Sequence, residues 1–134
     1  MGDAARKAVL FEAIAVTGKA LSNGKRLELL DLLAQGERSV DALARAAGLG
    51  LSTASARLQT LKQAGLVATR REGTRIHHRL AGRDVAALYA LLLQVARTHQ
   101  AAAEQARTAY LGPPAPASSP ARNCWSGSRP AAPP

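Results

Sequence analysis

The sequence is poor in several residue types, and each shortage narrows the possible functions. Aromatic residues make up 3% of its 134 residues, which argues against an RNA-binding sheet that stacks bases on exposed rings and against a large β-sandwich. The single cysteine, Cys124, cannot form an intramolecular disulfide. No apolar run reaches the ~18 residues that suggest a membrane span, and no signal-peptide core follows the charged N-terminus. These absences indicate a reduced, cytoplasmic protein with no membrane partner.

Acidic residues are also scarce. Nine Asp and Glu stand against 18 Lys and Arg, so the formal net charge is +9 at pH 7. A small domain with this excess of positive charge is expected to bind a polyanion. Nucleic acid is the first candidate and an acidic membrane surface the second.

Proline is absent from the first 112 residues, and all seven prolines lie at or beyond Pro113. Residues 112–134 are dense in Pro, Gly, Ser and Ala and show no apolar periodicity. Such a segment cannot bury enough apolar surface to offset its ordering entropy, so a disordered tail is predicted there. The folded domain is therefore expected within residues 1–111.

The folded region is mostly helical by its apolar periodicity, with a change to strand periodicity near residue 66. Ser22 or Asn23 is expected to cap the second helix and Ser39 the third. A Glu72-Gly73 turn is expected to join two strands. The fold class predicted is mainly α with a β-hairpin (α+β). The predicted helices are 6–20, 25–35, 39–48, 51–65 and 83–109, and the predicted strands are 66–71 and 74–80.

The third and fourth predicted helices are joined by the short link Gly48-Leu49-Gly50, as in a helix-turn-helix. In that motif the second helix lies in the DNA major groove. Small polar side chains let a helix sit deep in the groove and can bond base edges. Two helices joined by a short turn without any DNA role remain the alternative. The residues expected to face DNA are Ser52, Thr53, Ser55, Ala56 and Gln59.

The predicted hairpin is rich in arginine. Arg70, Arg71, Arg75 and Arg79 lie within ten residues, against one acid, Glu72. A two-stranded ribbon of this kind can act as a wing that reaches phosphates or the minor groove. Phosphate contacts are expected from Lys62, Arg70, Arg71 and Arg75. The alternative is a solvated edge hairpin whose arginines prevent aggregation.

These motifs together resemble the ArsR/SmtB family of winged helix-turn-helix repressors. The resemblance covers about residues 8–110, and its most specific parts are Ala-Gly-Leu-Val at 64–67 and Arg-Glu-Gly at 71–73. It implies a homodimer that pairs through its first and last helices. It also implies repression of an operon and release of DNA when an effector binds.

The usual metal sites of this family are absent from the sequence. Ser39 and Asp41 fill the positions of its thiolate pair on the third helix. On the last helix Asp84 is present, but Ala86, Arg97 and Gln100 fill the other ligand positions. His77 and His78 are adjacent on a strand and face opposite sides, and His99 stands alone. No metal, cofactor or enzymatic constellation is therefore expected, and the effector stays open.

The sequence thus predicts a DNA-binding transcriptional regulator, a repressor released by an effector. A winged-helix module that binds an acidic protein partner is the alternative. The segment 104–112 is similar to the end of the last helix in family members that continue into a rhodanese-like domain. A natural tail and a frameshift that replaced such a domain both fit residues 113–134; in the second case Cys124 and Trp125 carry no function.

Overall fold

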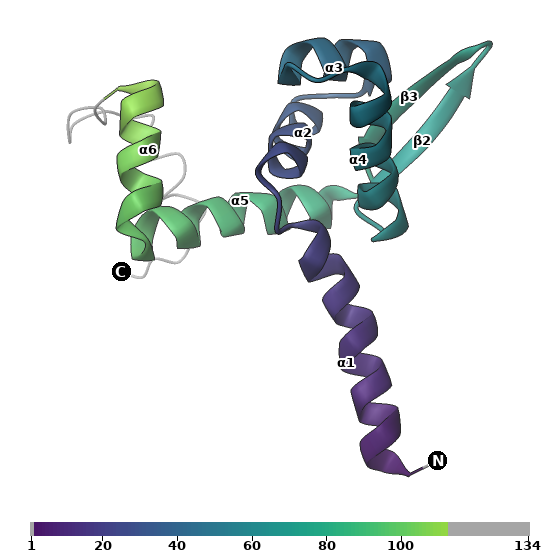
Figure 1. The fold of residues 1–134 in the computed structure, drawn as a ribbon, viewed down its shortest axis with the longest axis vertical. Coiled ribbons are helices and arrows are strands. Elements are labelled where there is room, and N and C mark those ends of the chain that lie inside the picture. The colour runs from purple at the N-terminus through teal and green to yellow at the C-terminus, as the bar shows by residue number, and fades with distance from the viewer. Residues whose placement is uncertain (1, 113–134) are drawn as a thin grey trace. The chain divides into compact units, whose positions relative to one another are not determined.

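A computed structural model describes residues 2–112, and the predicted tail with Cys124 and Trp125 lies outside the described residues. The mainly helical fold with a β-hairpin is confirmed (Figure 1). The boundary between two compact units falls after Leu91, within α5. The elements are α1 (Asp3–Ala20), α2 (Gly24–Ala34), β1 (Arg38–Ser39), α3 (Val40–Ala47), α4 (Leu51–Gln63), β2 (Val67–Glu72), β3 (Arg75–Leu80), α5 (Arg83–His99) and α6 (Ala101–Leu111).

The core of the first unit is built from leucines of three helices. Leu29 and Leu30 of α2, Leu43 of α3, and Leu58 and Leu61 of α4 are fully buried. Each such side chain contributes roughly 1.5–3 kcal/mol of burial free energy. Ala54, Leu58 and Leu61 face this core, so the opposite side of α4 is left to solvent.

Local capping fixes where the helices begin and end. The Asn23 side chain accepts a hydrogen bond from the Arg26 backbone N–H (3.0 Å), and Ser39 accepts one from that of Ala42 (3.2 Å). Gly48 ends α3 in the left-handed conformation, with φ at +68°. Glycine adopts this conformation easily because it has no Cβ to clash with the backbone. The chain can then reverse within three residues and start α4 against α3.

The sheet has the strand order β1-β3-β2, and both pairings are antiparallel. The hairpin of β2 and β3 turns at Gly73-Thr74, one residue later than predicted, with Gly73 at a φ of +64°. The two-residue strand β1 was not predicted, because a segment this short has no readable alternation. In Figure 1 the hairpin projects beyond α3 and α4.

Helix α1 is anchored by its last turn. Ala20 is buried, and the Thr17 hydroxyl donates to the Ala64 carbonyl (3.1 Å). Earlier along the helix, Phe11 and Ile14 leave 57% and 56% of their surface exposed. A face of large apolar side chains in water is unusual for a helix of a soluble domain. The set exposed on α1 is Val9, Leu10, Phe11, Ile14 and Val16.

The prediction of one last helix from Arg83 to Ala109 is wrong. Helix α5 ends at His99, and α6 begins at Ala101, because Gln100 takes an extended conformation (φ −122°, ψ 107°). The Arg97 guanidinium bonds the Glu104 carboxylate across this break (3.3 Å). Neither glycine nor proline stands there to signal it. Along α5, the side chains of Leu88, Leu91, Leu93 and Val95 are exposed.

Candidate nucleic-acid interface

Helix α4 turns one face to the core and the other to solvent. Ala54, Leu58 and Leu61 are buried, and this stripe fixes how the helix is rotated about its axis. All the α4 residues predicted to contact DNA are exposed. They are Ser52, Thr53, Ser55, Ala56, Gln59 and Lys62.

A hollow of about 320 Å³ lies between α4 and the hairpin. Ser55, Gln59 and Lys62 reach it from α4, and Arg71 reaches it from β2. Four predicted site residues are thus brought together from two elements. The remaining lining residues are Val40, Thr69, Ile76 and His78.

The strand register divides the hairpin into two faces. Thr69 lies opposite His78, and Arg71 lies opposite Ile76. Side chains on directly opposed residues of an antiparallel pair share one face of the sheet, and these four line the hollow beside α4. We call this set the inner face.

The outer face holds the alternate residues of the same strands. Arg70 lies opposite His77, and Glu72 lies opposite Arg75. The sequence did not distinguish Arg70 from Arg71, but the register places their side chains on opposite faces. The outer face is defined here as Arg70, Glu72, Arg75, His77 and Arg79.

Acidic side chains bind Arg70, one of the three arginines of the outer face. The Arg70 Nη2 and Nε atoms donate to the two carboxylate oxygens of Glu37 at 2.6 and 3.1 Å, and Arg70 Nη1 lies 3.8 Å from a Glu72 oxygen. The hydrogen bond from Arg70 lowers the pKa of Glu37 and raises that of Arg70. His77 Nε2 is 3.1 Å from Glu72 Oε1. Glu37 and Glu72 therefore balance the charge of Arg70.

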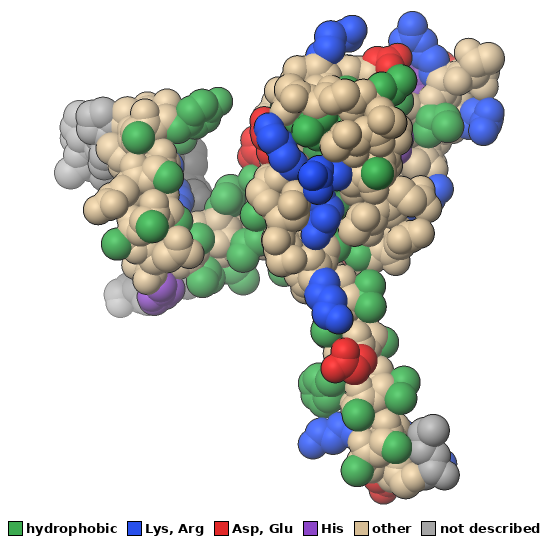
Figure 2. All heavy atoms as spheres, viewed as in Figure 1, with side chains coloured by type: hydrophobic (Ala, Val, Ile, Leu, Met, Phe, Trp, Pro, Cys, Tyr) green, Lys and Arg blue, Asp and Glu red, His purple; other side chains and the backbone are tan. Residues whose placement is uncertain are grey.

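No acidic side chain lines the hollow beside α4. Between Asp41 and Glu72 the chain has no acidic residue at all, and this interval includes α4 and most of β2. Figure 2 shows Lys and Arg side chains over α2, beside α4, and around the end of the hairpin. Uncompensated positive charge beside exposed hydroxyls and amides suits a polyanion.

His78 also lines this hollow. The His78 side chain is half-buried. Burial is the main cause that lowers its pKa, and the positive charge of Lys62 lowers it further. The imidazole is therefore neutral at neutral pH and adds no charge to the hollow. Its location could have been read from the period-2 alternation that places it two residues from Ile76.

His77 and His78 face opposite sides of the hairpin, as predicted. Within residues 2–112, no three His, Cys, Asp or Glu side chains gather closely enough to hold a metal ion. No helix in the same range is long and apolar enough to cross a membrane.

The chain is similar to known helix-turn-helix proteins. A model of the helix-turn-helix domain family matches residues 21–70, from the end of α1 into β2. A homodimeric winged helix-turn-helix DNA-binding domain from Mycobacterium bovis, described as a possible ArsR-family transcriptional regulator, is 58% identical and superposes with a TM-score of 0.69. The match covers 75% of this chain and 91% of that one. The chain belongs to the ArsR family of winged helix-turn-helix regulators.

Two curated relatives extend the comparison. An HTH-type transcriptional regulator of Mycobacterium tuberculosis is 56% identical over 113 residues, which are 84% of this chain and 50% of the relative. The biofilm growth-associated repressor of Agrobacterium fabrum is 42% identical over 82 residues, 58% of this chain and 70% of the relative. This ArsR-family chain thus spans about half the length of the mycobacterial relative that it matches.

Proposed function

We propose that this chain is a homodimeric repressor that binds double-stranded operator DNA through α4 and the inner face of the hairpin. The observation that carries the proposal is the acid-free surface formed by these two elements. A helix with small polar side chains fits the major groove. The fold supplies such a helix with its outward side exposed along its length.

Base readout is assigned to the outward side of α4. Ser52, Thr53, Ser55 and Gln59 can donate to and accept from base edges, and Ala56 lets the helix approach closely. The Lys62 and Arg71 side chains, which share the hollow, would hold phosphates. Arg70 and Arg75 contribute less, because they lie on the outer face beside Glu37 and Glu72.

Dimerisation is assigned to α1 and α5. Both helices expose large apolar side chains, and the Mycobacterium bovis domain is homodimeric. Sedimentation equilibrium should give a dimer for the wild-type chain, and the double variant Phe11→Asp, Ile14→Asp should sediment as a folded monomer. A wild-type monomer at micromolar concentration would contradict this assignment.

The DNA-binding proposal is tested by titrating the purified chain against the duplex upstream of its own gene. We expect a salt-sensitive complex with that duplex and a weaker one with a random duplex of equal length. A folded dimer that retards neither duplex at low salt would reject the proposal. That result would favour the protein-interaction module, which need not bind random DNA.

We further propose that the effector which releases DNA is not a zinc, cadmium or arsenic species bound by the folded domain. Ser39 and Asp41 stand where the family has its thiolate pair, so no soft-metal site is formed there. Calorimetric titration of the chain with each ion should show no stoichiometric binding at micromolar affinity. A stoichiometric ion that dissociates the DNA complex would show this proposal to be wrong.

A further inference from the structure

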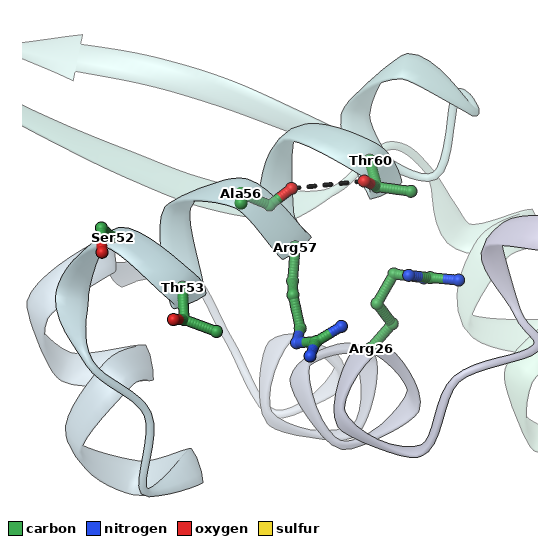
Figure 3. Close-up of a pocket in the computed structure, with 6 residues that line it drawn as sticks. All are labelled: Arg26, Ser52, Thr53, Ala56, Arg57 and Thr60. Carbon is green, nitrogen blue, oxygen red and sulfur yellow. Dashed lines mark hydrogen bonds between the residues drawn. The ribbon is translucent and has the colours of Figure 1, made fainter.

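A second hollow, of about 340 Å³, lies on the other side of α4, against α2 (Figure 3). Its lining contains two arginines and no acidic residue. The hollow beside the hairpin opens next to Ser55 and Lys62, whereas this one opens next to Thr53 and Thr60. Helix α4 is therefore flanked by a basic hollow on each side. The lining residues are Arg26, Ser52, Thr53, Ala56, Arg57 and Thr60.

Arg57 extends from α4 toward α2, into the space between Thr53 and Arg26 (Figure 3). Its side chain is partly buried, and its Nε–H is shielded from solvent without an acceptor within residues 2–112. Partial burial of a guanidinium costs desolvation free energy, and without a nearby carboxylate no ion pair offsets that cost. An anion in the hollow would supply that compensation.

Arg26 adds a second charge that is held in position. Its Nε donates to the Ala20 carbonyl (2.8 Å) and its Nη2 to that of Lys19 (3.1 Å). These carbonyls end α1, and they orient the guanidinium without neutralising it. The Arg57 guanidinium and the hydroxyls of Ser52 and Thr53 thus share one hollow with the Arg26 side chain, whose guanidinium is turned toward the end of α1 (Figure 3). The Thr60 hydroxyl donates to the Ala56 carbonyl (3.3 Å).

We propose that this hollow binds a phosphate group through Arg57, with Arg26 as the supporting charge. Guanidinium groups match phosphate oxygens in geometry and charge. This proposal rests on the proposed function, because the phosphate that the hollow binds belongs to the DNA backbone. A helix in the major groove, about 12 Å wide, has a phosphate backbone on each side. The hairpin hollow then meets one strand, and the Arg26–Arg57 hollow meets the other.

The first experiment measures duplex affinity by fluorescence anisotropy across a salt series for the wild-type dimer, Arg57→Gln, Arg57→Lys and Arg83→Gln. Arg83 is exposed and lines neither hollow, so its variant controls for the loss of one charge. We expect Arg57→Gln to bind upstream and random duplexes about tenfold more weakly, with a salt slope smaller by about one. Arg57→Lys should recover part of the affinity, and Arg83→Gln should match the wild type.

A second experiment uses inorganic phosphate without DNA and reads the thermal unfolding midpoint. A phosphate-dependent rise in the wild type that is lost in Arg57→Gln, without any change in DNA affinity, would assign the hollow to free phosphate. Wild-type DNA binding with an unchanged affinity and slope in folded Arg57→Gln, and no phosphate-dependent rise, would overturn the phosphate site and leave the proposed function standing. If the wild type binds no duplex, the proposed function fails. The unfolding experiment with inorganic phosphate then decides by itself whether the hollow binds phosphate.

Discussion

The two faces of one hairpin differ in what surrounds their arginines. On the outer face, Arg70 forms two hydrogen bonds with Glu37, and Glu72 lies opposite Arg75. On the inner face, Arg71 lies opposite Ile76 in a hollow that no acidic side chain lines. Neighbours in sequence thus have different electrostatic surroundings. Under the proposed function, the facing of a basic residue, rather than the number of basic residues, decides whether it contacts DNA.

The largest effect is expected when an acid is placed on the inner face. Ile76→Glu would put a carboxylate opposite Arg71 and beside the DNA phosphates. Because it both neutralises Arg71 and repels the duplex, we expect a loss of about a hundredfold in duplex affinity at low salt. Ile76→Gln introduces a side chain of nearly the same shape as glutamate but without the charge, so it should lose much less duplex affinity. Equal losses in the two variants would mean that packing, not charge, governs this position.

A smaller effect separates the two neighbouring arginines. Arg71→Ala should weaken binding to all duplexes about tenfold, because one phosphate contact is lost. Arg70→Ala should weaken it far less and should leave the urea unfolding midpoint nearly unchanged, since exposed ion pairs contribute little stability. Anisotropy titrations of both variants in one buffer provide the check. A greater loss in Arg70→Ala would reverse the roles given to the two faces.

Freeing the outer arginine should have a modest effect of the opposite sign. Glu37→Gln removes the carboxylate that binds Arg70, so the outer face becomes more positive. We expect random-duplex affinity to rise by about threefold or less at low salt, and the gain to vanish near 1 M salt as screening becomes strong. Unchanged or weaker binding would show that the outer face does not approach DNA even when its charge is unbalanced.

The smallest effect concerns pH and the imidazole of the inner face. Burial lowers the pKa of His78 below its usual 6.5, so unfolding lets this residue take up a proton. Its contribution is complete above pH 6.5 and is lost as pH falls toward the lower native pKa. Urea unfolding at pH 7 and pH 5 should therefore show a smaller pH-dependent loss for His78→Gln than for the wild type. An identical loss would remove His78 from the groups that govern acid stability.

Much of the fold could be predicted because local signals specify it. Ser39 caps α3 as predicted, Gly48 ends that helix, and Ala54, Leu58 and Leu61 recur at helical spacing, so each of these signals acts within a few residues of itself. The alternation of the strands even separates Arg70 from Arg71, once it is known which face lies against α4.

The rest depends on contacts between distant residues. Glu37 bonds Arg70 across 33 positions, and two-residue β1 exists because it pairs with β3. Arg26 and Arg57 line one hollow although they belong to different helices. Likewise, no glycine or proline near Gln100 predicts the break between α5 and α6. Such features follow from how the helices and strands pack, which neither composition nor periodicity encodes.

The most direct test of the account observes the arginine side chains themselves. In a titration of the ¹⁵N-labelled dimer with the upstream duplex, the Nε–Hε resonances of Arg70 and Arg71 report on the two faces separately. We predict that the Arg71 resonance shifts with saturation of the duplex, together with the backbone amides of α4, while the Arg70 resonance keeps the position set by Glu37. A shift confined to Arg70, or a saturated complex in which neither Arg71 nor α4 responds, would contradict the claim that α4 and the inner face bind DNA.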